Sequence, residues 1–367
     1  MVLYIFASIL VMFMSYFVNS SYNKKNVLNN GTAVLSRQQF INRVLLFSIF
    51  LILFSISALR VGIGNDYWEY RYRFLDIERG DTKVSYEWGF RMLVRLTQIL
   101  FGLDNYRTTF ALFSFLTVAF FIKGLYDGAD YFFYSFFLFI CNGFYFMSFS
   151  NVRYYFAFAV ALFAIQYVWK EKPIRFILWI CVAALFHKTV LLVIPVYFVA
   201  YYLKWTKKTI WMIPVACFGL FFGRIPIRWL LFKIYPYYEG DLILDVTTIS
   251  YANIAKCAAI LILCLLFYKD SIKGNKKAEF LFNLNLFALV LYCFGTYIPQ
   301  LSRICYYMVL SHVFLIPIAL LGIEAKKKRV IFTALVAVAY VGYYLVFLYK
   351  GYDSYTMFLP YLSWLFV

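Results

Sequence analysis

Repeated apolar runs, separated by short basic segments, constrain this chain more than any other feature. An apolar run of about 20 residues spans a bilayer as one helix, and 64% of the 367 residues are hydrophobic. Only 14% are charged, whereas a soluble domain carries about 25%. We therefore predict an all-α fold: a single integral membrane domain over residues 1–367, built as a polytopic bundle of about 12 transmembrane helices.

The basic segments predict how these helices are oriented, because cytoplasmic loops carry an excess of Lys and Arg. Val2–Val18 has no basic region ahead of it and is followed by Lys24 and Lys25. This order is the reverse of a cleavable signal peptide, so we predict an uncleaved first span with both chain termini extracytoplasmic. The other predicted spans are Val44–Leu59, Thr108–Ile122, Tyr131–Met147, Asn151–Trp169, Ile174–Leu203, Thr209–Gly223, Tyr251–Tyr268, Phe280–Ile298, Ile304–Ile323 and Val330–Tyr349.

The net charge of +18 would suggest nucleic acid in a soluble protein, but no nucleic-acid motif is present and the cations fall in short loops. In the predicted topology 15 of the 20 lysines lie inside, whereas 11 of the 15 arginines lie outside. The guanidinium group is a planar fork that binds phosphate through two hydrogen bonds. The sequence therefore places its phosphate-binding forks on the outer side, and it predicts membrane lipids but no nucleic acid as partners.

The longest polar interval, Arg60–Phe90, opens a first large extracytoplasmic loop over residues 60–107. Its Gly62 and Gly64 allow tight bends or close approach to a ligand. Within it, Glu87–Phe101 has the period of an amphipathic helix. That helix either lies on the outer membrane surface or packs on the bundle, with Arg91, Arg95 and Gln98 on its polar face and Phe90, Leu93, Val94, Thr97, Leu100 and Phe101 on its apolar face. Residues 224–250 form a second extracytoplasmic loop.

The apolar segment Ile174–Leu203 is too long for one simple span, and both of its flanks are basic. If both flanks are cytoplasmic, the chain goes out and returns as two short or broken helices, with His187 and Lys188 near the apex. Irregular backbone at this depth is tolerated where it is buried in protein or lines a wet cavity.

Three arginines, Arg60, Arg153 and Arg303, lie at the predicted outer ends of spans. An arginine in a membrane helix costs roughly 2.5–3.5 kcal/mol on insertion scales. They either converge on a phosphate group or extend to outer-leaflet headgroups; the sequence leaves both open.

A group transfer to a hydroxyl needs a base, which a carboxylate or a histidine can provide. Asp66 and Glu87 are the best-placed carboxylates, unless they form salt bridges with nearby arginines. His187 is the best-placed histidine, whereas His312 reads as structural. The seven cysteines lie in or beside apolar segments without a CxxC pair or a His/Cys/carboxylate cluster, so we predict no metal site.

Several short motifs, in order, resemble those of the EpsG family. The first is Arg60-Val-Gly62-Ile-Gly64-Asn-Asp66-Tyr67-Trp68-Glu-Tyr70, followed by Glu87–Phe90. The others are Asn151-x-Arg153 at the start of a span, Phe186-His187-Lys188-Thr189, and Arg303 before Tyr306 and Tyr307. Lys188 departs from the small residue usual there, which weakens that motif.

The resemblance implies a bacterial inner-membrane glycosyltransferase of the Wzy type, which polymerises O-antigen, capsule or exopolysaccharide. Such an enzyme joins undecaprenyl-pyrophosphate-linked repeat units at the outer face, with a GT-C-like helical fold, a chain-length regulator as partner and no cofactor. We therefore predict that Arg60, Arg153 and Arg303 bind the diphosphate. Asp66 or else His187 accepts the proton and Arg153 assists catalysis, while Tyr67, Trp68, Tyr70 and Glu87 contact sugars.

Three other classes stay open. An O-antigen ligase would share the donor chemistry and differ in the acceptor. A flippase or transporter would line a continuous path with basic residues, often with internal repeats, which this sequence lacks. A glycan acyltransferase would carry a histidine-centred site near the cytoplasmic side, whereas His187 is predicted outside.

Overall fold

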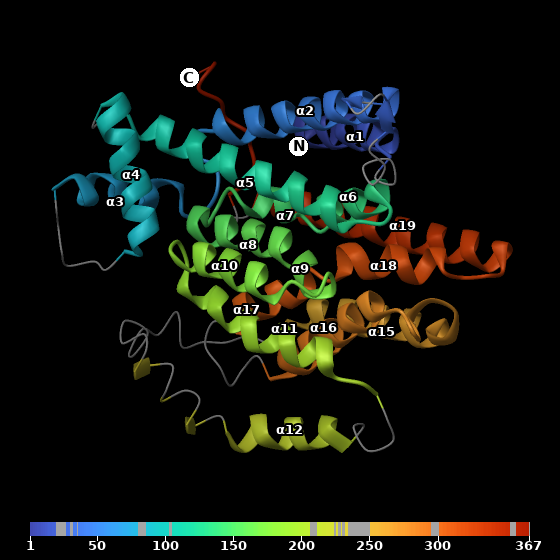
Figure 1. The fold of residues 1–367 in the computed structure, drawn as a ribbon. Helices are drawn as coiled ribbons and strands as arrows, with labels where there is room; N and C mark the ends of the chain where they lie inside the picture. The colour runs from blue at the N-terminus through green and yellow to red at the C-terminus, as the bar shows by residue number, and fades with distance from the viewer. Residues whose placement is uncertain are drawn as a thin grey trace. The chain divides into compact units, whose positions relative to one another are not determined.

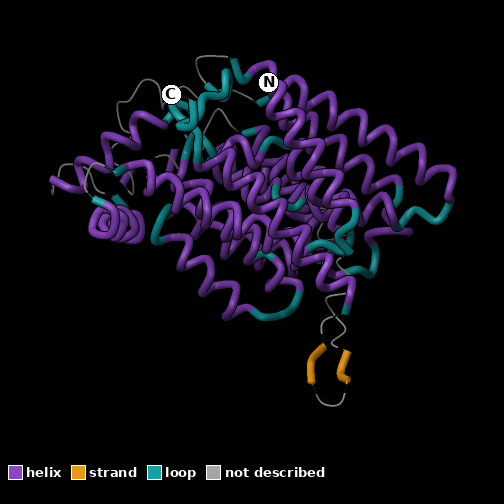
Figure 2. The backbone as a smooth tube through the Cα atoms, turned by 90° about the horizontal axis from the view of Figure 1, so that it is seen from above, coloured by secondary structure: helices purple, strands orange, loops and turns teal. Residues whose placement is uncertain are grey.

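The computed structural model describes residues 1–19, 27–29, 32–34, 36–79, 86–102, 105–205, 211–223, 225–226, 229, 232–233, 250–294, 301–352 and 357–366. Within these ranges the chain is helical, apart from a small hairpin of β1 (Val27–Asn29) and β2 (Thr32–Val34) (Figure 2). The secondary structure of the described residues confirms the prediction of an all-α fold. The helices form two compact units, residues 1–191 with 330–367 (unit 1) and residues 192–329 (unit 2), which we describe separately.

Unit 1 is built around α5 and α8, which pack against each other and carry α2 and α10 on their other sides (Figure 1). Every residue of α8 except Arg153 is buried, because neighbouring helices surround it. The helices of unit 1 are α1 (Val2–Tyr16), α2 (Arg37–Ala58), α3 (Tyr67–Arg79), α4 (Trp88–Phe101), α5 (Tyr106–Gly128), α6 (Phe132–Cys141), α7 (Phe144–Met147), α8 (Val152–Ala164), α9 (Gln166–Trp169), α10 (Pro173–Ala184) and α19 (Lys326–Lys350, most of it).

Unit 2 is organised around α16 (Lys276–Cys293), which contacts α11, α15, α17 and α18. Asn283 is fully buried on α16 and donates to the carbonyls of Ala200 and Leu203, while Trp205 donates to its Oδ1. These bonds satisfy backbone carbonyls at the end of α11, which would otherwise lack partners in an apolar interior. The other elements are α11 (Val193–Tyr202), α12 (Met212–Phe222), α15 (Tyr251–Leu266), the π-helical turn η5 (Tyr268–Ile272), α17 (Leu301–Val309) and α18 (His312–Leu321), with the 3-10 turn η2 (Lys188–Leu192) at the boundary.

Five helical segments in the described ranges are long and apolar enough to cross a membrane: Arg37–Ala58, Tyr106–Gly128, Val152–Trp169, Leu301–Leu321 and Lys326–Lys350. Five shorter apolar helices accompany them: Val2–Tyr16, Phe132–Cys141, Pro173–Ala184, Lys188–Tyr202 and Tyr251–Leu266. A membrane-spanning helical bundle is therefore supported, whereas the count of about 12 spans and the GT-C-like arrangement stay predictions.

The structure divides one span that the sequence predicted as continuous. The segment Tyr131–Met147 breaks at Asn142 and Gly143, where Gly143 has φ of +74°. The predicted span Ile304–Ile323 keeps its helical course, with a turn at Leu310 and Ser311 between α17 and α18. The predicted interruption of Ile174–Leu203 is confirmed, because α10 ends at Ala184 and Lys188 begins η2.

Helix α4 covers most of the range Glu87–Phe101 that was predicted to be helical, but one of its side chains is placed differently from the prediction. Gln98 is buried and donates to the carbonyl of Phe74 on α3, so its assignment to the polar face was wrong. Leu100 and Phe101, on the predicted apolar face, are exposed, as expected if this end of the helix lies on the membrane surface. Helices α3 and α4 lie at one end of the long helices of unit 1, and α4 crosses their direction (Figure 1).

The C-terminal segment returns to the start of the first loop. The Val61 amide donates to Leu362 and the Trp364 amide donates to Leu59, while the Tyr361 hydroxyl donates to the carbonyl of Ile56. These bonds tie residues 357–366 to the stretch that precedes α3. The second extracytoplasmic loop predicted at 224–250 lies mostly outside the described residues, as do residues 80–85 and 103–104 of the first.

Replacing Gly64 with alanine should strongly destabilise this loop. Gly64 has φ of +95°, and a Cβ there would overlap the Phe149 carbonyl, with its carbon at 2.6 Å. The left-handed region alone costs a residue with a side chain roughly 1–2 kcal/mol, and here backbone must also move. Gly62 is the matched control, because it also has a positive φ, +63°, but its Cβ would meet only the Trp68 ring at 3.4 Å.

Thermal unfolding of the detergent-purified variants would measure the difference. We expect Gly64→Ala to lose clearly more stability than Gly62→Ala, whose loss should stay near about 1 kcal/mol. Equal losses would mean that the contact with Phe149 does not constrain the loop.

Candidate active site

The candidate site lies in unit 1, where the start of α8 meets the residues around α3 and α4. Asn151 precedes α8, and its Oδ1 accepts from the Tyr154 amide at 3.1 Å. This cap satisfies one of the free amides of the first turn and fixes the first turn, on which Arg153 lies. The side chain of Arg153 is thereby presented at the end of a helix that is otherwise buried.

Arg153 is held by one carboxylate and three aromatic rings. Its Nη1 lies 2.5 Å from Oε2 of Glu87, and each side chain is 15% exposed. The guanidinium carbon lies 5.1 Å from the centre of the Phe90 ring, 5.7 Å from that of Tyr86 and 6.0 Å from that of Tyr70. Such contacts between a cation and an aromatic ring add to the ion pair and fix the plane of the fork.

Tyr70 connects the first loop to this arginine. Its hydroxyl donates to Oδ1 of Asn151 at 2.9 Å and accepts from Nε of Arg153 at 3.5 Å. Nη2 of Arg153 donates no hydrogen bond among the described residues, so this edge of the fork stays available. The sequence predicted Glu87 as a sugar ligand and left open a salt bridge to a nearby arginine. The structure shows that salt bridge, with Arg153.

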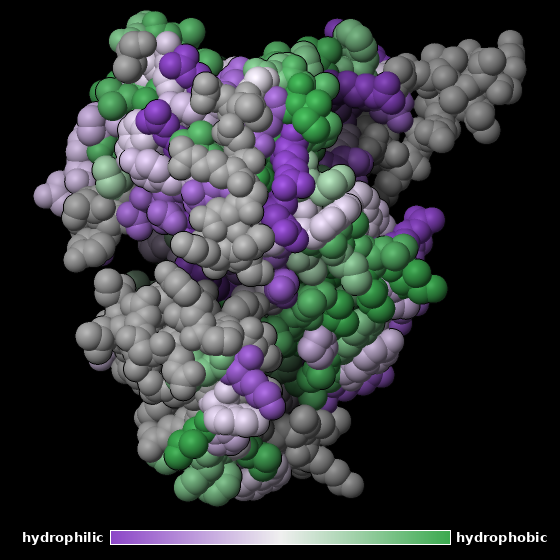
Figure 3. Space-filling model, turned by 90° about the vertical axis from the view of Figure 1, so that its left-hand side faces the viewer, coloured by the Kyte–Doolittle hydropathy of each residue, from purple (hydrophilic) through white to green (hydrophobic). Residues whose placement is uncertain are grey.

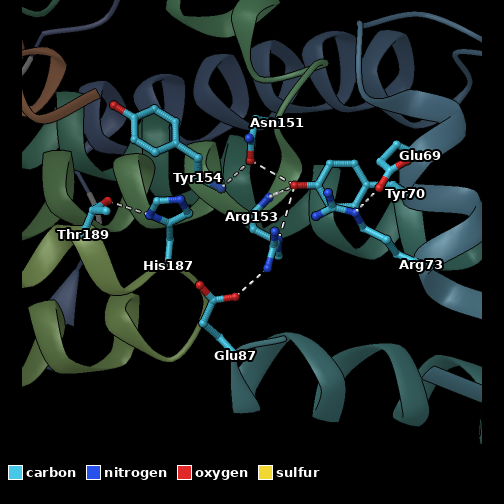
Figure 4. A network of polar contacts seen from close by, with 9 residues as sticks. All are labelled: Glu69, Tyr70, Arg73, Glu87, Asn151, Arg153, Tyr154, His187 and Thr189. Carbon is cyan, nitrogen blue, oxygen red and sulfur yellow. Dashed lines mark hydrogen bonds and ion pairs between the residues drawn. The ribbon is translucent and has the colours of Figure 1, made fainter. Parts of the chain in front are cut away.

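His187 joins the same cluster through the close approach of α4 to the break after α10. The Gly89 amide donates to the carbonyl of Leu185 at 2.9 Å, and a Cβ at Gly89 would lie 2.8 Å from Cβ of Leu185. The His187 ring contacts Tyr154 edge-on at 5.3 Å. Figure 4 shows Glu87, Arg153 and His187 pointing toward a common space from three elements.

The tautomer of His187 is coupled to a neighbouring hydroxyl. Oγ1 of Thr189 lies 2.6 Å from Nδ1. If Nδ1 carries the proton and donates to Thr189, then Nε2 is unprotonated and can accept a proton. Thr189, Tyr86 and Phe90 were not singled out as site residues from the sequence. Phe90 and Thr189 lie within the motifs Glu87–Phe90 and Phe186-His187-Lys188-Thr189, which could have indicated them, whereas Tyr86 was marked only by its position beside Glu87.

Arg60 does not contact this cluster. It is 2% exposed, and its Nη1 donates to the carbonyl of Ser57 and, at 3.1 Å each, to Oγ of Ser57 and of Ser114. Burial lowers its pKa to about 10, so it is charged at neutral pH. These contacts fix the end of α2 to α5, and the predicted diphosphate role of Arg60 stays a prediction.

The other predicted site residues are dispersed. Asp66 precedes α3, is partly buried, and its carbonyl accepts from the Tyr70 amide. Tyr67 is buried against Phe110, whereas Trp68 is 43% exposed. Arg303 lies on α17 in unit 2, so its convergence with Arg153 stays a prediction. Among the described residues, no group of His, Cys, Asp and Glu could hold a metal ion.

The long apolar helices, with a polar cluster at the end of one unit, define a multi-pass helical membrane protein. The model of the EpsG family matches residues 43–363. The chain therefore belongs to the EpsG family of exopolysaccharide-polymerase-like membrane proteins, and it is a membrane protein of polysaccharide biosynthesis. Searches of curated proteins and of solved structures find no significant match.

Proposed function

We propose that this protein is a polysaccharide polymerase that joins undecaprenyl-pyrophosphate-linked oligosaccharide units at the outer face of the cytoplasmic membrane. The observation that carries the proposal is the cluster of Arg153, Glu87 and His187 in a protein of the EpsG family. It combines an arginine whose Nη2 donates to no residue in the described ranges with a histidine whose Nδ1 lies 2.6 Å from Oγ1 of Thr189.

In the proposed reaction, an acceptor hydroxyl attacks the anomeric carbon of the donor sugar. The bond between that carbon and the pyrophosphate oxygen breaks, and the polyprenyl pyrophosphate leaves with the electron pair. Arg153 stabilises the negative charge that develops on the leaving group. His187 takes the hydroxyl proton through Nε2, and the pyrophosphate leaving group supplies the driving force.

Glu87 has two consequences for this assignment. It holds Arg153 in place before the substrate arrives, so little ordering is needed on binding. It also neutralises part of the arginine charge, and a diphosphate that binds must compete with it. We therefore infer that the free Nη2 edge meets the substrate first, while Nη1 keeps its bond to Glu87.

The glycan profile of cells that lack the protein tests the proposal. A single lipid-linked repeat unit in these cells, with a ladder restored by the wild-type protein, would establish a polymerase. An unchanged ladder would remove the proposal. Repeat units trapped on the inner leaflet would indicate a flippase, and polymer that is made but not transferred to its final acceptor would indicate a ligase.

A further inference from the structure

A second group of aromatic and arginine side chains lies on unit 1, outside the Arg153 cluster. It comes from three segments that are distant in the sequence: the start of α3, the start of α5 and the C-terminal segment. We call it the aromatic platform and define it by Trp68, Arg71, Tyr106, Arg107 and Trp364. Figure 3 looks onto the end of unit 1 that carries α3 and α4, where hydrophilic residues gather beside exposed hydrophobic ones.

The platform alternates rings and guanidinium groups. The guanidinium carbon of Arg71 lies 5.7 Å from the centre of the Trp68 ring and 4.9 Å from that of Tyr106. The Tyr106 ring contacts Trp364 at 5.9 Å, and Arg107 lies 3.2 Å from the centre of a Trp364 ring. Each arginine therefore lies over at least one aromatic ring, and this contact restricts the positions that its guanidinium group can take.

Neither Arg71 nor Arg107 forms an ion pair within the described part of the chain, although Arg73 on the same helix pairs with Glu69. Both are exposed. A guanidinium stacked on a ring still presents its N–H donors at the edge, where a planar carboxylate can bind through two hydrogen bonds.

Trp68 rests on a buried tyrosine, Tyr67, which is packed between aromatic rings. Tyr67 stacks on Phe110 at 4.5 Å and contacts Trp68 edge-on at 5.1 Å. Its hydroxyl is buried and has no hydrogen-bond partner among the residues that the structure describes. Burial raises the pKa of Tyr67 to about 12, so the hydroxyl keeps its proton and can donate. Buried polar groups normally have a partner.

We propose that the aromatic platform binds an acidic saccharide, a sugar that carries a carboxylate, as part of the glycan. The exposed ring of Trp68 offers its electron-rich face to the C–H groups of a pyranose ring, and Arg71 and Arg107 bind the carboxylate. This inference rests on the proposed function, because it names the class of glycan that the polymerase holds. The platform is a binding site and takes no part in bond breaking.

A lipid headgroup is the alternative occupant, because tryptophan, tyrosine and arginine also gather at membrane interfaces. Residues of an interfacial belt contact lipid independently of one another. Here the rings and guanidinium groups contact one another across three segments, and Trp364 is fixed by its backbone bond to Leu59. A preorganised array of this kind favours a rigid ligand with a ring.

Binding of tetragalacturonate to the purified protein in nanodiscs of neutral lipid tests the proposal. Calorimetry at about 150 mM salt screens distant charges, because the Debye length is then about 8 Å. We expect the wild type to bind tetragalacturonate and not maltotetraose. Arg71→Gln and Arg107→Gln should each weaken binding at least about 10-fold, the expected size of a lost charge-assisted bond. Arg91→Gln is the matched control, because Arg91 is an exposed arginine on α4 that lies over no aromatic ring in the described ranges.

Three outcomes would overturn the proposal that the platform binds an acidic saccharide. They are unchanged binding in Arg71→Gln, equal binding of maltotetraose, and loss of tetragalacturonate binding when phosphatidylglycerol is added, which would assign the arginines to lipid. Arg71 is exposed on one helix, so Arg71→Gln decides the question even if Arg107→Gln loosens the C-terminal segment. Arg153→Lys should bind tetragalacturonate as the wild type does. Binding of tetragalacturonate therefore tests the platform, whereas polymerisation by Arg153→Lys tests the catalytic assignment, and either proposal can fail without the other.

Discussion

Replacing Arg153 with lysine should lower polymerisation by at least about 100-fold, the loss typical when one donor to a developing negative charge is removed. Lysine keeps the charge but loses the planar fork. Its single nitrogen has to serve both Glu87, which lies 2.5 Å from Nη1 of Arg153, and the diphosphate, whereas arginine offers a separate nitrogen to each. The three rings around the guanidinium also fit a flat cation better than a compact ammonium.

The measurement is the glycan ladder of a deletion strain that carries each variant at matched protein level. Arg91→Lys is the control, because it makes the same exchange on α4 away from the cluster, and we expect a normal ladder. A full chain-length distribution in Arg153→Lys, with normal membrane insertion, would remove Arg153 from the site.

The second large effect should come from His187. We expect His187→Gln to lower the rate by about 100-fold or more, because a positioned general base contributes about 10²–10⁴-fold. Glutamine keeps a polar group beside Thr189 but cannot accept the proton. Thr189→Val should cost less, about 10-fold, because it removes only the partner of Nδ1 and leaves the imidazole in place.

Asp66→Asn distinguishes the two bases that the sequence left open. If His187 is the base, Asp66→Asn keeps most activity, measured as the rate of lipid-linked repeat consumption in membranes. If Asp66→Asn loses activity while His187→Gln retains it, the role belongs to Asp66. We expect the role to belong to His187, because its ring lies beside Glu87 and Arg153 (Figure 4).

The sequence predicts the parts of this fold that depend on local pattern. Apolar runs located the helices, and basic flanks located the break before Lys188, because both signals are contained within a few tens of residues. The faces of α4 were less predictable. Gln98 was counted as polar and placed outward, but its amide meets the Phe74 carbonyl on α3, a partner that periodicity does not reveal.

Long-range contacts account for the rest. The Glu87–Arg153 pair was considered as one salt bridge among several, since many charges in the first loop could have paired with an arginine. Arg60 was read as a diphosphate ligand because of its position in a motif. Its burial by Ser57 and Ser114 depends on how α2 and α5 pack, which the local sequence does not specify.

The bonds between the C-terminal segment and the first loop have a consequence for biosynthesis. Ile56 and Tyr361 are 305 residues apart, and at about 5–20 residues per second the ribosome needs roughly 15–60 s to cover that interval. Throughout that time the stretch before α3 has been synthesised, but the C-terminal segment to which it will be hydrogen-bonded has not. The nascent chain therefore cannot assemble a finished loop until α19 has been inserted, which delays activity until the last helix is in the membrane.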